Sequence, residues 1–405
     1  MEDKLRPLRV LHSFPHRLGK ARICTTAWYE IDSAAAAGAE MLVLAGDSVR
    51  PFQRPVLVRT TLSRGKLRIP YRLLGTLRAC ALHDWLVARE LPKLSGKVDI
   101  IHAWPLAALN TIKTAKKLGI PVALERCNAH TRFAYEVAQK ECQRIGLQLP
   151  KGHEHAYNHE VLRREEEEYA LADAILCPSD FVVKTFLDQG FTKGRLVRFF
   201  YGVDDKIFFP DPNRQVPKSG GLIMIFVGVC AVRKGLHYAL EAWLNSTASK
   251  DGTFLIAGDF LPEYRKKLEP MLAHPSVKVL GHRNDVPALM RQSDLLVLPS
   301  IEEGFGLVCT EAMASGCVPL VSDACTDLCR HMENAMVHHV GDCEELRGQI
   351  NFLNDHRQEL SRLRAAGMQT IPSISWAAAG KSLVFAYQNI IKMHQMQSLG
   401  DLTIS

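Results

Sequence analysis

Short apolar runs of strand length alternate with helix-like segments along the whole chain, and the alternation stops and restarts near its middle. The predicted strands are 8–14, 40–45, 98–103, 120–124 and 173–178 before the interruption, and 222–229, 253–258, 277–280 and 295–298 after it. Helical patterns between them cover 20–38, 105–119, 235–243, 261–273 and 285–292. Strands that alternate with helices pair in parallel through right-handed crossovers, which predicts Rossmann-like α/β domains.

The interruption has the composition of a linker. Residues 204–221 are rich in Pro, Asp, Lys and Gly, with prolines at 210, 212 and 217 and a Gly-Gly pair at their end. A chain of 405 residues is long enough for two domains of ordinary size, each with its own core. We therefore expect one domain at 1–209, a second at 210–375 and a helical segment at 376–405.

Composition favours a globular enzyme of the cytoplasm. Hydrophobic residues make up 47% of the chain and charged residues 23%, and no apolar stretch reaches the length of a transmembrane helix. Glu2 and Asp3 precede any apolar segment, so a signal peptide is not expected. The eleven cysteines are scattered without a C-x-x-C pair, which indicates free thiols in a reducing compartment.

Positive charge is concentrated at residues 54–97, which contain ten Lys or Arg and two acids, whereas the formal net charge of the whole chain is +7. Residues 71–78 and 85–87 suggest a basic helix with an apolar stripe. Such a helix can lie on the anionic inner face of a membrane, meet a phosphorylated acceptor, or simply pack on the core, which is the favoured interpretation. Interleaved aromatics and reader motifs are missing from the sequence, so nucleic-acid binding is not expected.

One segment in the second half places two carboxylates around a glycine turn. The strand at 295–298 runs into Pro-Ser-Ile-Glu-Glu-Gly-Phe-Gly, and a short helix follows that holds Glu311, eight residues after Glu303. The free amides of the turn lie at a helix N-terminus, which favours phosphate or another electron-rich group. Glu303 can accept hydrogen bonds from sugar hydroxyls, and Glu311 can accept both hydroxyls of a ribose. The segment predicts a site for a nucleotide-linked sugar.

The same segment resembles the E-x7-E signature of family 4 of the retaining glycosyltransferases. Residues 299–319 match its Pro-Ser, Glu-Gly-Phe-Gly and Glu-Ala-Met-Ala elements, and only the end, Cys317-Val318-Pro319-Leu320, is shifted by one residue. The resemblance implies the GT-B fold, in which two Rossmann-like domains face each other across a cleft and the last helix crosses back to the first domain. It implies a retaining, metal-independent hexosyltransferase that uses a nucleotide diphosphate sugar as donor, without a further cofactor.

The resemblance also implies roles for residues of the second half. Lys234 falls on the family lysine that holds the donor diphosphate, within a loop that runs from Gly228 to Gly235. Val229 stands where an arginine is usual, and Arg233 can substitute for it. The expected donor-binding residues are Gly228, Arg233, Lys234, His282, Arg283, Glu303, Gly304, Phe305, Gly306, Leu307 and Glu311, with His282 and Arg283 where the backbone meets the base.

In the first half, the resemblance implies that His130 faces the donor sugar, so the expected catalytic set is Glu303, His130 and Lys234. The loop at 13–20 has one glycine where many family members have two, which leaves the acceptor open: a glycan, a lipid-linked molecule or a small molecule. His12, His16 and His102 lie at or beyond strand ends and can also face the cleft.

Several alternatives stay open. A catalytically silent sugar-nucleotide-binding subunit fits the missing arginine and the altered first loop, and a GT-B epimerase or phosphorylase would use the same donor pocket. His153, His155 and His159 are close enough in sequence for a metal site, although a helix face is favoured and no metal is expected. The acidic run at 165–168 predicts a solvated helix face.

Overall fold

The computed structural model describes residues 6–65, 67–69, 74–150, 152–153, 155–214 and 220–402. Parts of four predictions lie outside these residues: Glu2 and Asp3 at the start, the basic stretch at 66 and 70–73, the linker at 215–219 and the chain end at 403–405.

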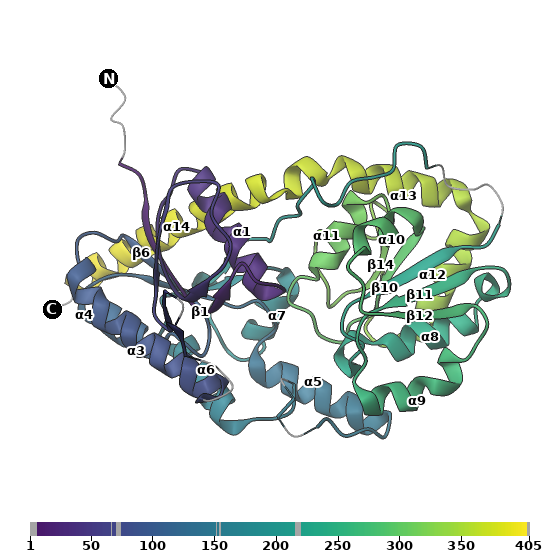
Figure 1. Cartoon of the computed structure of the whole chain (residues 1–405), viewed down its shortest axis with the longest axis horizontal. Helices are drawn as coiled ribbons and strands as arrows, with labels where there is room; N and C mark the ends of the chain where they lie inside the picture. Colours follow the sequence, from purple (N-terminus) through teal and green to yellow (C-terminus); the bar gives the residue numbers. More distant parts are fainter. Residues whose placement is uncertain are drawn as a thin grey trace.

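Each half of the chain forms one parallel sheet flanked by helices (Figure 1). The first sheet has the order β3-β2-β1-β6-β7-β8-β9 and the second the order β12-β11-β10-β13-β14-β15. The first sheet consists of β1 (Arg9–Leu18), β2 (Glu40–Ser48), β3 (Val56–Thr60), β6 (Ile100–Ala103), β7 (Val122–Glu125), β8 (Ala174–Cys177) and β9 (Leu196–Arg198). The second consists of β10 (Ile223–Val227), β11 (Thr253–Ala257), β12 (Val277–Gly281), β13 (Leu295–Leu298), β14 (Val318–Ser322) and β15 (Met336–His338).

The helices connect these strands and cover both faces of the sheets. A two-stranded hairpin, β4 (Ser63–Arg64) and β5 (Leu67–Arg68), also lies in the first half. The helices there are α1 (Ile23–Ala36), α3 (Thr76–Leu94), α4 (Leu109–Lys117), α5 (Thr131–Arg144), α6 (His159–Leu171) and α7 (Asp180–Leu187). Those of the second half are α8 (Leu236–Leu244), α9 (Pro262–Leu272), α10 (Val286–Gln292), α11 (Leu307–Ala314), α12 (Cys343–Asp355), α13 (Arg357–Gln369) and α14 (Trp376–Leu402).

The strand order reverses at the same place in both sheets. β1 lies between β2 and β6, and β10 lies between β11 and β13. Loops that leave the carboxyl ends of two such neighbouring strands run in opposite directions, so a crevice opens between them where ligands bind. The predicted strand–turn–helix segment follows β13, and the predicted Lys234 loop follows β10, so both belong to the crevice of the second sheet.

The fold prediction is confirmed: the chain has two parallel-sheet α/β domains of the Rossmann type. The main local difference is β1, which was predicted to end at residue 14 but continues to Leu18 with a pairing irregularity between Phe14 and Arg17. The strand continues because Arg17 and Leu18 still pair with Asp47 and Ser48 of β2. The loop expected at 13–20 is therefore largely strand.

Two chain crossings connect the halves. Val203 pairs with Ser375 in a parallel bridge, and Gly202 packs so tightly on Trp376 that a Cβ on the glycine would lie 2.4 Å from the Trp376 backbone. From there α14 runs back along α1 (Figure 1), and its Tyr387 is fully buried in the core of the first domain. The predicted boundary near residue 210 lies between β9 and β10.

No helix in the described part of the chain combines the length and apolar character that crossing a membrane requires. All eleven cysteines are free thiols.

Candidate active site

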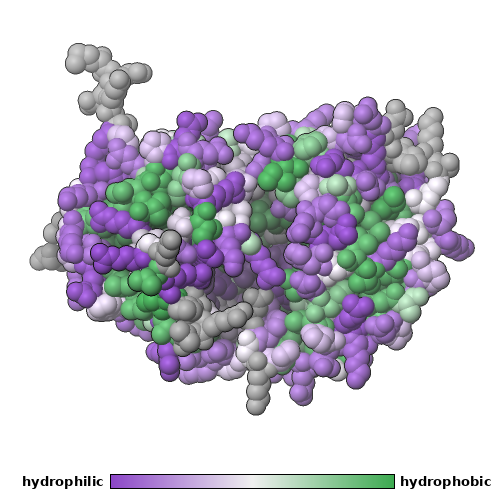
Figure 2. Space-filling model, in the orientation of Figure 1, coloured by the Kyte–Doolittle hydropathy of each residue, from purple (hydrophilic) through white to green (hydrophobic). Residues whose placement is uncertain are grey.

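A cavity of about 660 Å³ lies where the second-domain crevice meets the first domain, and Figure 2 shows the surface hollowed between the two halves. Its walls come from the loops after β10, β11, β12 and β13, from the first turn of α1, and from the chain crossing at 202–204. Among the expected donor-binding residues, the cavity is lined by Gly228, Arg233, Lys234, His282, Arg283, Glu303, Gly306, Leu307 and Glu311. We call it the donor cavity.

A glycine brings the two charged loops of the crevice together. Gly235 has a φ of 66°, and a Cβ there would lie 1.8 Å from the carbonyl oxygen of Pro299. Glycine is required because it tolerates this left-handed conformation and leaves room for the opposing backbone. The close approach places the Lys234 ammonium against the Glu303 carboxylate, and Arg233 Nη1 lies 3.7 Å from the same Glu303 oxygen.

Two cations hold Glu303 in its charged form. Its side chain is almost fully buried, and burial alone would raise the pKa of this carboxyl. The charges of Lys234 and Arg233 and a hydrogen bond from Ser300 outweigh burial and lower the pKa of Glu303 to about 2. Arg233 also donates to the Glu302 carbonyl oxygen at 3.2 Å. The floor of the cavity therefore carries Lys234, Arg233 and Glu303 as charges at fixed positions, and Arg233 Nη1 also lies 3.6 Å from the Glu302 carboxylate.

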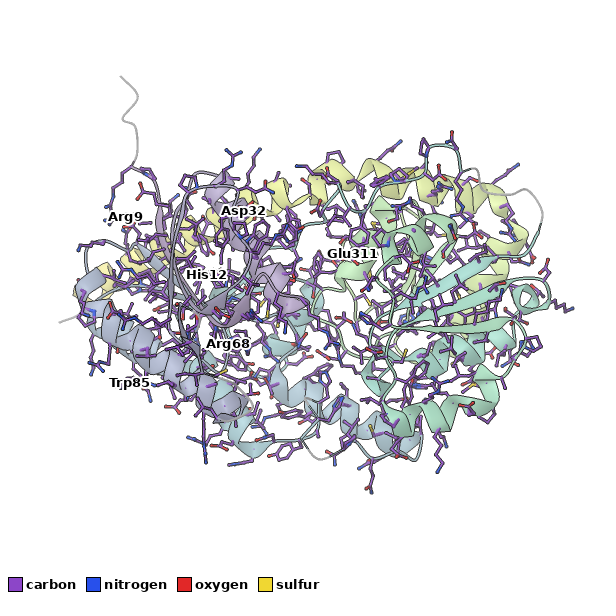
Figure 3. All side chains as sticks on the ribbon, in the orientation of Figure 1. Arg9, His12, Asp32, Arg68, Trp85 and Glu311 are labelled. Atoms are coloured by element: carbon purple, nitrogen blue, oxygen red, sulfur yellow. The ribbon has the colours of Figure 1, made fainter. Side chains whose placement is uncertain are left out.

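Glu311 lies in a different electrostatic setting. It sits on α11 facing the space between the halves (Figure 3) and lines the donor cavity. Burial raises the pKa of the Glu311 carboxyl to about 7. Because Glu311 is half-buried and lines the cavity, its carboxylate is suited to accept hydrogen bonds from a ligand that enters there.

The glycine turn is divided between the cavity and the other domain. Gly306, with a φ of 73°, and Leu307 line the donor cavity at the N-terminus of α11. Gly304 and Phe305 do not line it: the Gly304 carbonyl accepts a hydrogen bond from Ser179 Oγ at 2.6 Å, and Phe305 is buried against Tyr201. Both residues therefore lie at the contact between the domains, and their expected contact with the donor stays a prediction.

The residues expected near the base lie at the rim. The His282 side chain is largely exposed and lies 3.6 Å from Asp259, while Arg283 forms an ion pair with Asp285 at 2.6 Å. Val229, which replaces the usual arginine, lines the cavity next to Arg233. Arg233 thus supplies a guanidinium to the same cavity from four residues further along.

The first domain contributes cavity residues that the sequence analysis missed. Arg22 and Thr26, at the start of α1, and Tyr29, one turn later, line the donor cavity together with Arg50. Arg22 has a φ of 52°, a strained conformation for a residue with a side chain. The guanidinium of Arg50 lies 3.7 Å from the centre of the Trp28 ring. No motif marks these residues, and they become recognisable only when α1 is seen to point its N-terminus at the second-domain crevice.

A second cavity of about 710 Å³ lies on the first-domain side. It is lined by polar and aromatic side chains from segments far apart in sequence, and it shares Ile23 with the donor cavity. Glu302, next to Glu303 in sequence, also lines it. We call it the acceptor-side cavity; its polar and aromatic lining includes His16, Arg78, Trp104, Arg126, Asn128, Thr131, Tyr135, His153, His155, Tyr157, Glu165 and Glu302.

With this geometry established, comparison with known proteins identifies the family. Residues 25–206 match the family described as Glycosyltransferase Family 4, and residues 221–356 match the family described as glycosyl transferases group 1. The two matches include most of both sheets. The chain belongs to the family 4 type of glycosyltransferases, with the GT-B fold.

Solved glycosyltransferases share the fold along almost the whole chain. The structure of Anabaena HepE in complex with UDP and glucose superimposes with a TM-score of 0.67, covering 94% of this chain and 99% of HepE at 18% identity. Sucrose-phosphate synthase from Thermosynechococcus elongatus gives a TM-score of 0.71 at 17% identity, over 96% of this chain and all of that one. At such identities the likeness concerns the fold alone.

Among curated relatives, the N-acetyl-alpha-D-glucosaminyl L-malate synthase of Bacillus anthracis is 28% identical over 171 residues, 40% of this chain and 44% of the relative. The 2-deoxystreptamine glucosyltransferase of Streptomyces kanamyceticus is 29% identical over 161 residues, 37% of this chain and 41% of the relative. The chain thus spans less than half the length of these relatives, whose substrates differ from each other.

The histidine that the family resemblance places opposite the donor lies outside both cavities. His130 is buried between Tyr169 and Phe186, lines neither cavity, and caps α5 by accepting a hydrogen bond from the Arg132 amide at 3.3 Å. Burial lowers the pKa of His130 to about 3, helped by Arg126 and Arg132. The imidazole is therefore neutral and faces an aromatic core rather than the cleft.

Other polar residues of the first domain also differ from expectation. His12 and His102 are fully buried and line neither cavity, whereas His16 lines the acceptor-side cavity. The solvated face expected at 165–168 is wrong for two of its residues. Glu168 is buried and accepts hydrogen bonds from three backbone amides at 2.7–3.1 Å, and Glu165 is buried beside Arg126.

The three histidines considered as metal ligands or as a helix face lie in two different elements of the structure. His153 and His155 lie in a turn and line the acceptor-side cavity, and His159 is the first residue of α6. The helix-face interpretation therefore fails for the first two. The reason is that Asn158 caps α6 by accepting hydrogen bonds from the Glu160 and Val161 amides, so the helix begins after the turn.

Proposed function

We propose that the protein is a retaining, metal-independent glycosyltransferase that moves a hexosyl group from a nucleotide diphosphate sugar to an acceptor hydroxyl. The donor occupies the donor cavity, and the acceptor approaches through the acceptor-side cavity. The observation that carries this proposal is the arrangement of Lys234, Arg233 and Glu303 at the carboxyl ends of β10 and β13.

The fixed cations suit a diphosphate leaving group. As the bond to the sugar breaks, negative charge develops on the diphosphate, and preorganised cations stabilise it without reorganising. Lys234 and Arg233 supply this charge from one side, and the first turn of α1 with Arg22 lies on the other side of the cavity. The N-termini of α1 and α11 add favourable backbone dipoles. Charge stabilisation by these groups supports a reaction without a metal ion.

The carboxylates have separate tasks in this proposal. Glu303 is charged at neutral pH and accepts hydrogen bonds from the hydroxyls of the transferred sugar. Glu311 accepts the ribose hydroxyls. Retention of anomeric configuration follows if the acceptor reacts on the face from which the diphosphate departs, with the diphosphate oxygen taking the acceptor proton. Closure of the domains over both cavities limits hydrolysis.

We further infer that part of the basic stretch lies on an anionic membrane surface. The apolar face of α3 is buried in the core, through residues such as Val87 and Leu91, so the favoured packing interpretation holds for that face. Trp85 on the opposite side of α3 is 47% exposed with Arg89 over its ring, and Leu57 of the edge strand β3 is 57% exposed next to Arg59. Exposed apolar groups beside cations are typical of interfacial surfaces.

The proposal is tested with the purified chain and a panel of uridine-, guanosine- and adenosine-diphosphate sugars. Free nucleotide is measured without acceptor and without added metal, in the presence and absence of a chelator. We expect slow release from one donor, unaffected by the chelator. Glu303→Gln and Lys234→Met should each lower the rate by roughly 100- to 1,000-fold, the range seen when a preorganised charge is removed from a transition state.

Two matched variants control for charge and fold. Lys278→Met removes an exposed lysine of β12, and Glu333→Gln an exposed carboxylate, neither of which lines a cavity. Both should keep the wild-type rate.

A different result would contradict transfer activity. If a donor binds but no nucleotide is released even with a broad acceptor mixture, and Glu303→Gln binds that donor equally well, the silent binding subunit is the better description.

A further inference from the structure

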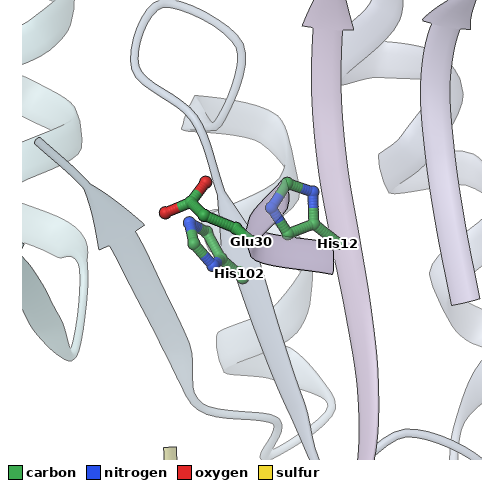
Figure 4. A group of neighbouring side chains, drawn as sticks. All are labelled: His12, Glu30 and His102. Carbon is green, nitrogen blue, oxygen red and sulfur yellow. The ribbon is translucent and has the colours of Figure 1, made fainter. Parts of the chain in front are cut away.

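Four polar side chains meet in the interior of the first domain, beneath its own crevice. They are His12 on β1, Glu30 on α1, His102 on β6 and Glu125 at the end of β7. All four are at most 2% exposed, and none lines either cavity. Figure 4 shows the side chains of His12, Glu30 and His102 pointing toward one another. We call these four residues the buried cluster.

The ligand atoms of the buried cluster converge. One ring nitrogen of each histidine and one oxygen of Glu30 all lie within 4.8 Å of one another. His102 Nε2 is also 3.1 Å from Glu125 Oε2. At this distance the two side chains are in direct contact, so Glu125 fixes the His102 imidazole beside the point where the other ligand atoms converge.

The hydrogen bonds of the buried cluster are incomplete. Neither oxygen of Glu30 accepts a hydrogen bond from any residue that the structure describes, and Glu125 Oε2 and His102 Nε2 have only each other, at 3.1 Å. On His12, Nδ1 has no partner among those residues and Nε2 meets the Trp104 indole N–H at 3.5 Å. Buried polar atoms are almost always paired, so a group of unpaired atoms at one point indicates a missing occupant.

Charge leads to the same conclusion. Two carboxyl groups lie in a region without water access, and the described Lys and Arg residues form no ion pair with either of them. The guanidinium of Arg126, which follows Glu125 in the chain, is directed at the Ala129 carbonyl at 2.7–2.9 Å and at Glu165 at 3.4 Å. Burying carboxylates without a counter-charge is costly. A divalent cation would neutralise both at once.

The outer contacts of the buried cluster orient the ligands. His102 Nδ1 lies 2.7 Å from the Tyr387 hydroxyl, so a proton on Nδ1 leaves Nε2 free for a metal. The Tyr201 hydroxyl donates to the other oxygen of Glu125. Hydrogen bonds of this kind behind histidine and carboxylate ligands are typical of metal sites. Tyr387 comes from α14 and Tyr201 from the chain crossing, so the ligand set is linked to both connections between the domains.

We propose that the buried cluster is a structural metal site that holds one divalent transition-metal ion, with zinc as the best match, bound by His12, Glu30 and His102, with Glu125 held beside His102. Two imidazoles and a carboxylate are suitable zinc ligands, and the buried position of the cluster outside both cavities suits a structural ion. The ion would join β1, α1 and β6. Because the site lies outside both cavities, sugar transfer itself still needs no added metal.

The site is tested first by metal content. The chain is produced with a cleavable tag that contains no histidine run, purified without chelator, and analysed for first-row transition metals by mass spectrometry. We expect about one zinc per chain. Glu30→Gln and His102→Gln should reduce this to less than a fifth, whereas His153→Ala combined with His155→Ala and, separately, Glu303→Gln should retain it, because those residues lie outside the buried cluster.

Two further measurements keep the test independent of how the variants fold. Wild-type chain stripped of metal should lose roughly 5–10 °C of melting temperature, and zinc should restore it, because an ion that binds only the folded state stabilises it. Cobalt in place of zinc should give visible absorption bands of a site with nitrogen and oxygen ligands. A wild-type chain that carries no metal after purification and takes up neither ion would overturn the proposal and leave a proton shared between the carboxyls as the occupant. Donor turnover is not used in any of these readouts, so their outcome is independent of the proposed transfer activity.

Discussion

The two domains have the same strand order around their switch points, yet they use the two crevices in opposite ways. In the second domain, the loops after β10 and β13 have glycines at 228, 235 and 306, which leave space that side chains would fill. Charged groups line the open cavity there. In the first domain, β1 continues to Leu18 and the polar residues near the switch point, including His12 and His102, are sealed in the core. The crevice of the second domain presents its charged groups to a ligand, whereas the polar groups of the first domain are enclosed in the core.

This difference explains why one crevice can be interpreted from the sequence and the other cannot. A ligand phosphate that approaches a backbone requires glycines at fixed spacing, and that requirement is visible in the sequence. A buried polar network can be made from many residue types on several elements, as long as each group finds a partner. Under the proposed function, the first domain is then free to vary the surface that meets the acceptor, whereas the second is constrained by the donor.

The largest expected effect comes from separating the two crevices. In Gly304→Ala, the new Cβ would lie 1.6 Å from the Cys127 carbonyl oxygen and 2.9 Å from Asn128 Cα, both backbone atoms of the other domain. The domains must move apart at this contact, and misplacement of reacting groups by about 1 Å can cost roughly 100-fold in rate. We expect kcat/KM for transfer, measured by nucleotide release, to fall at least that far.

The control for Gly304→Ala is Gly348→Ala in α12, where a Cβ meets no atom within 4 Å. This variant should keep full activity and gain up to about 1 kcal/mol of stability from helix propensity. Wild-type kcat/KM in Gly304→Ala would mean that the donor crevice works without this contact with the first domain, and the comparison of two coupled crevices would have to be abandoned.

The next effect tests whether Arg233 replaces the arginine that Val229 lacks. Arg233→Met should lower kcat/KM by roughly 10- to 100-fold, because one of two fixed cations is removed from the cavity. Adding Val229→Arg to this variant should restore part of the loss, since residue 229 lines the same cavity. Arg265→Met, on the exposed side of α9, serves as the control for loss of a guanidinium. If Arg233→Met keeps the wild-type kcat/KM, there is no loss to rescue, and Lys234 alone suffices.

A smaller effect distinguishes the two carboxylates of the donor cavity. The pKa of Glu303 is lowered to about 2, so it stays charged at any working pH, whereas burial raises the pKa of Glu311 to about 7. Donor binding needs Glu311 deprotonated, so acidification through this pKa must weaken it. The apparent Kd for donor, measured by calorimetry, should rise about tenfold between pH 8 and pH 6. In Glu311→Gln the affinity should be lower and independent of pH; a flat wild-type profile would contradict the role of Glu311.

The fold and the donor cavity were largely predictable because their requirements are local. Apolar runs such as 295–298 predict parallel strands, and the spacing of Glu303 and Glu311 around a glycine turn predicts where they meet a ligand. The exceptions within that motif are Gly304 and Phe305, which turned out to serve the contact between the domains. Sequence spacing gives the turn but not which side of it faces the other domain.

The first domain was much less predictable because its partners are distant in the chain. Glu168 looked like part of a solvated acidic run, yet its carboxylate accepts hydrogen bonds from the backbone amides of Leu106, Ala108 and Leu109, about sixty positions earlier. His130 looked like a cleft residue, but Phe186 and Tyr169 from later helices enclose it. Arg22 and Arg50 reach the donor cavity only because α1 and the loop after β2 point toward the second domain. Such pairings depend on tertiary packing, which one sequence does not reveal.

The smallest effect concerns the outer surfaces, where the first domain carries the exposed Trp85 and its neighbouring arginines. If this surface rests on an anionic bilayer, each arginine contributes about 1 kcal/mol of binding near the membrane. Arg59→Gln and Arg89→Gln should therefore each reduce partitioning to vesicles rich in phosphatidylglycerol about fivefold, as measured by co-sedimentation, with Arg330→Gln in the second domain as an unaffected control. Neutral vesicles should bind little in every case. Equal binding of all variants, or none to anionic vesicles, would mean that α3 serves packing alone, and the functional difference between the domains would then be confined to their crevices.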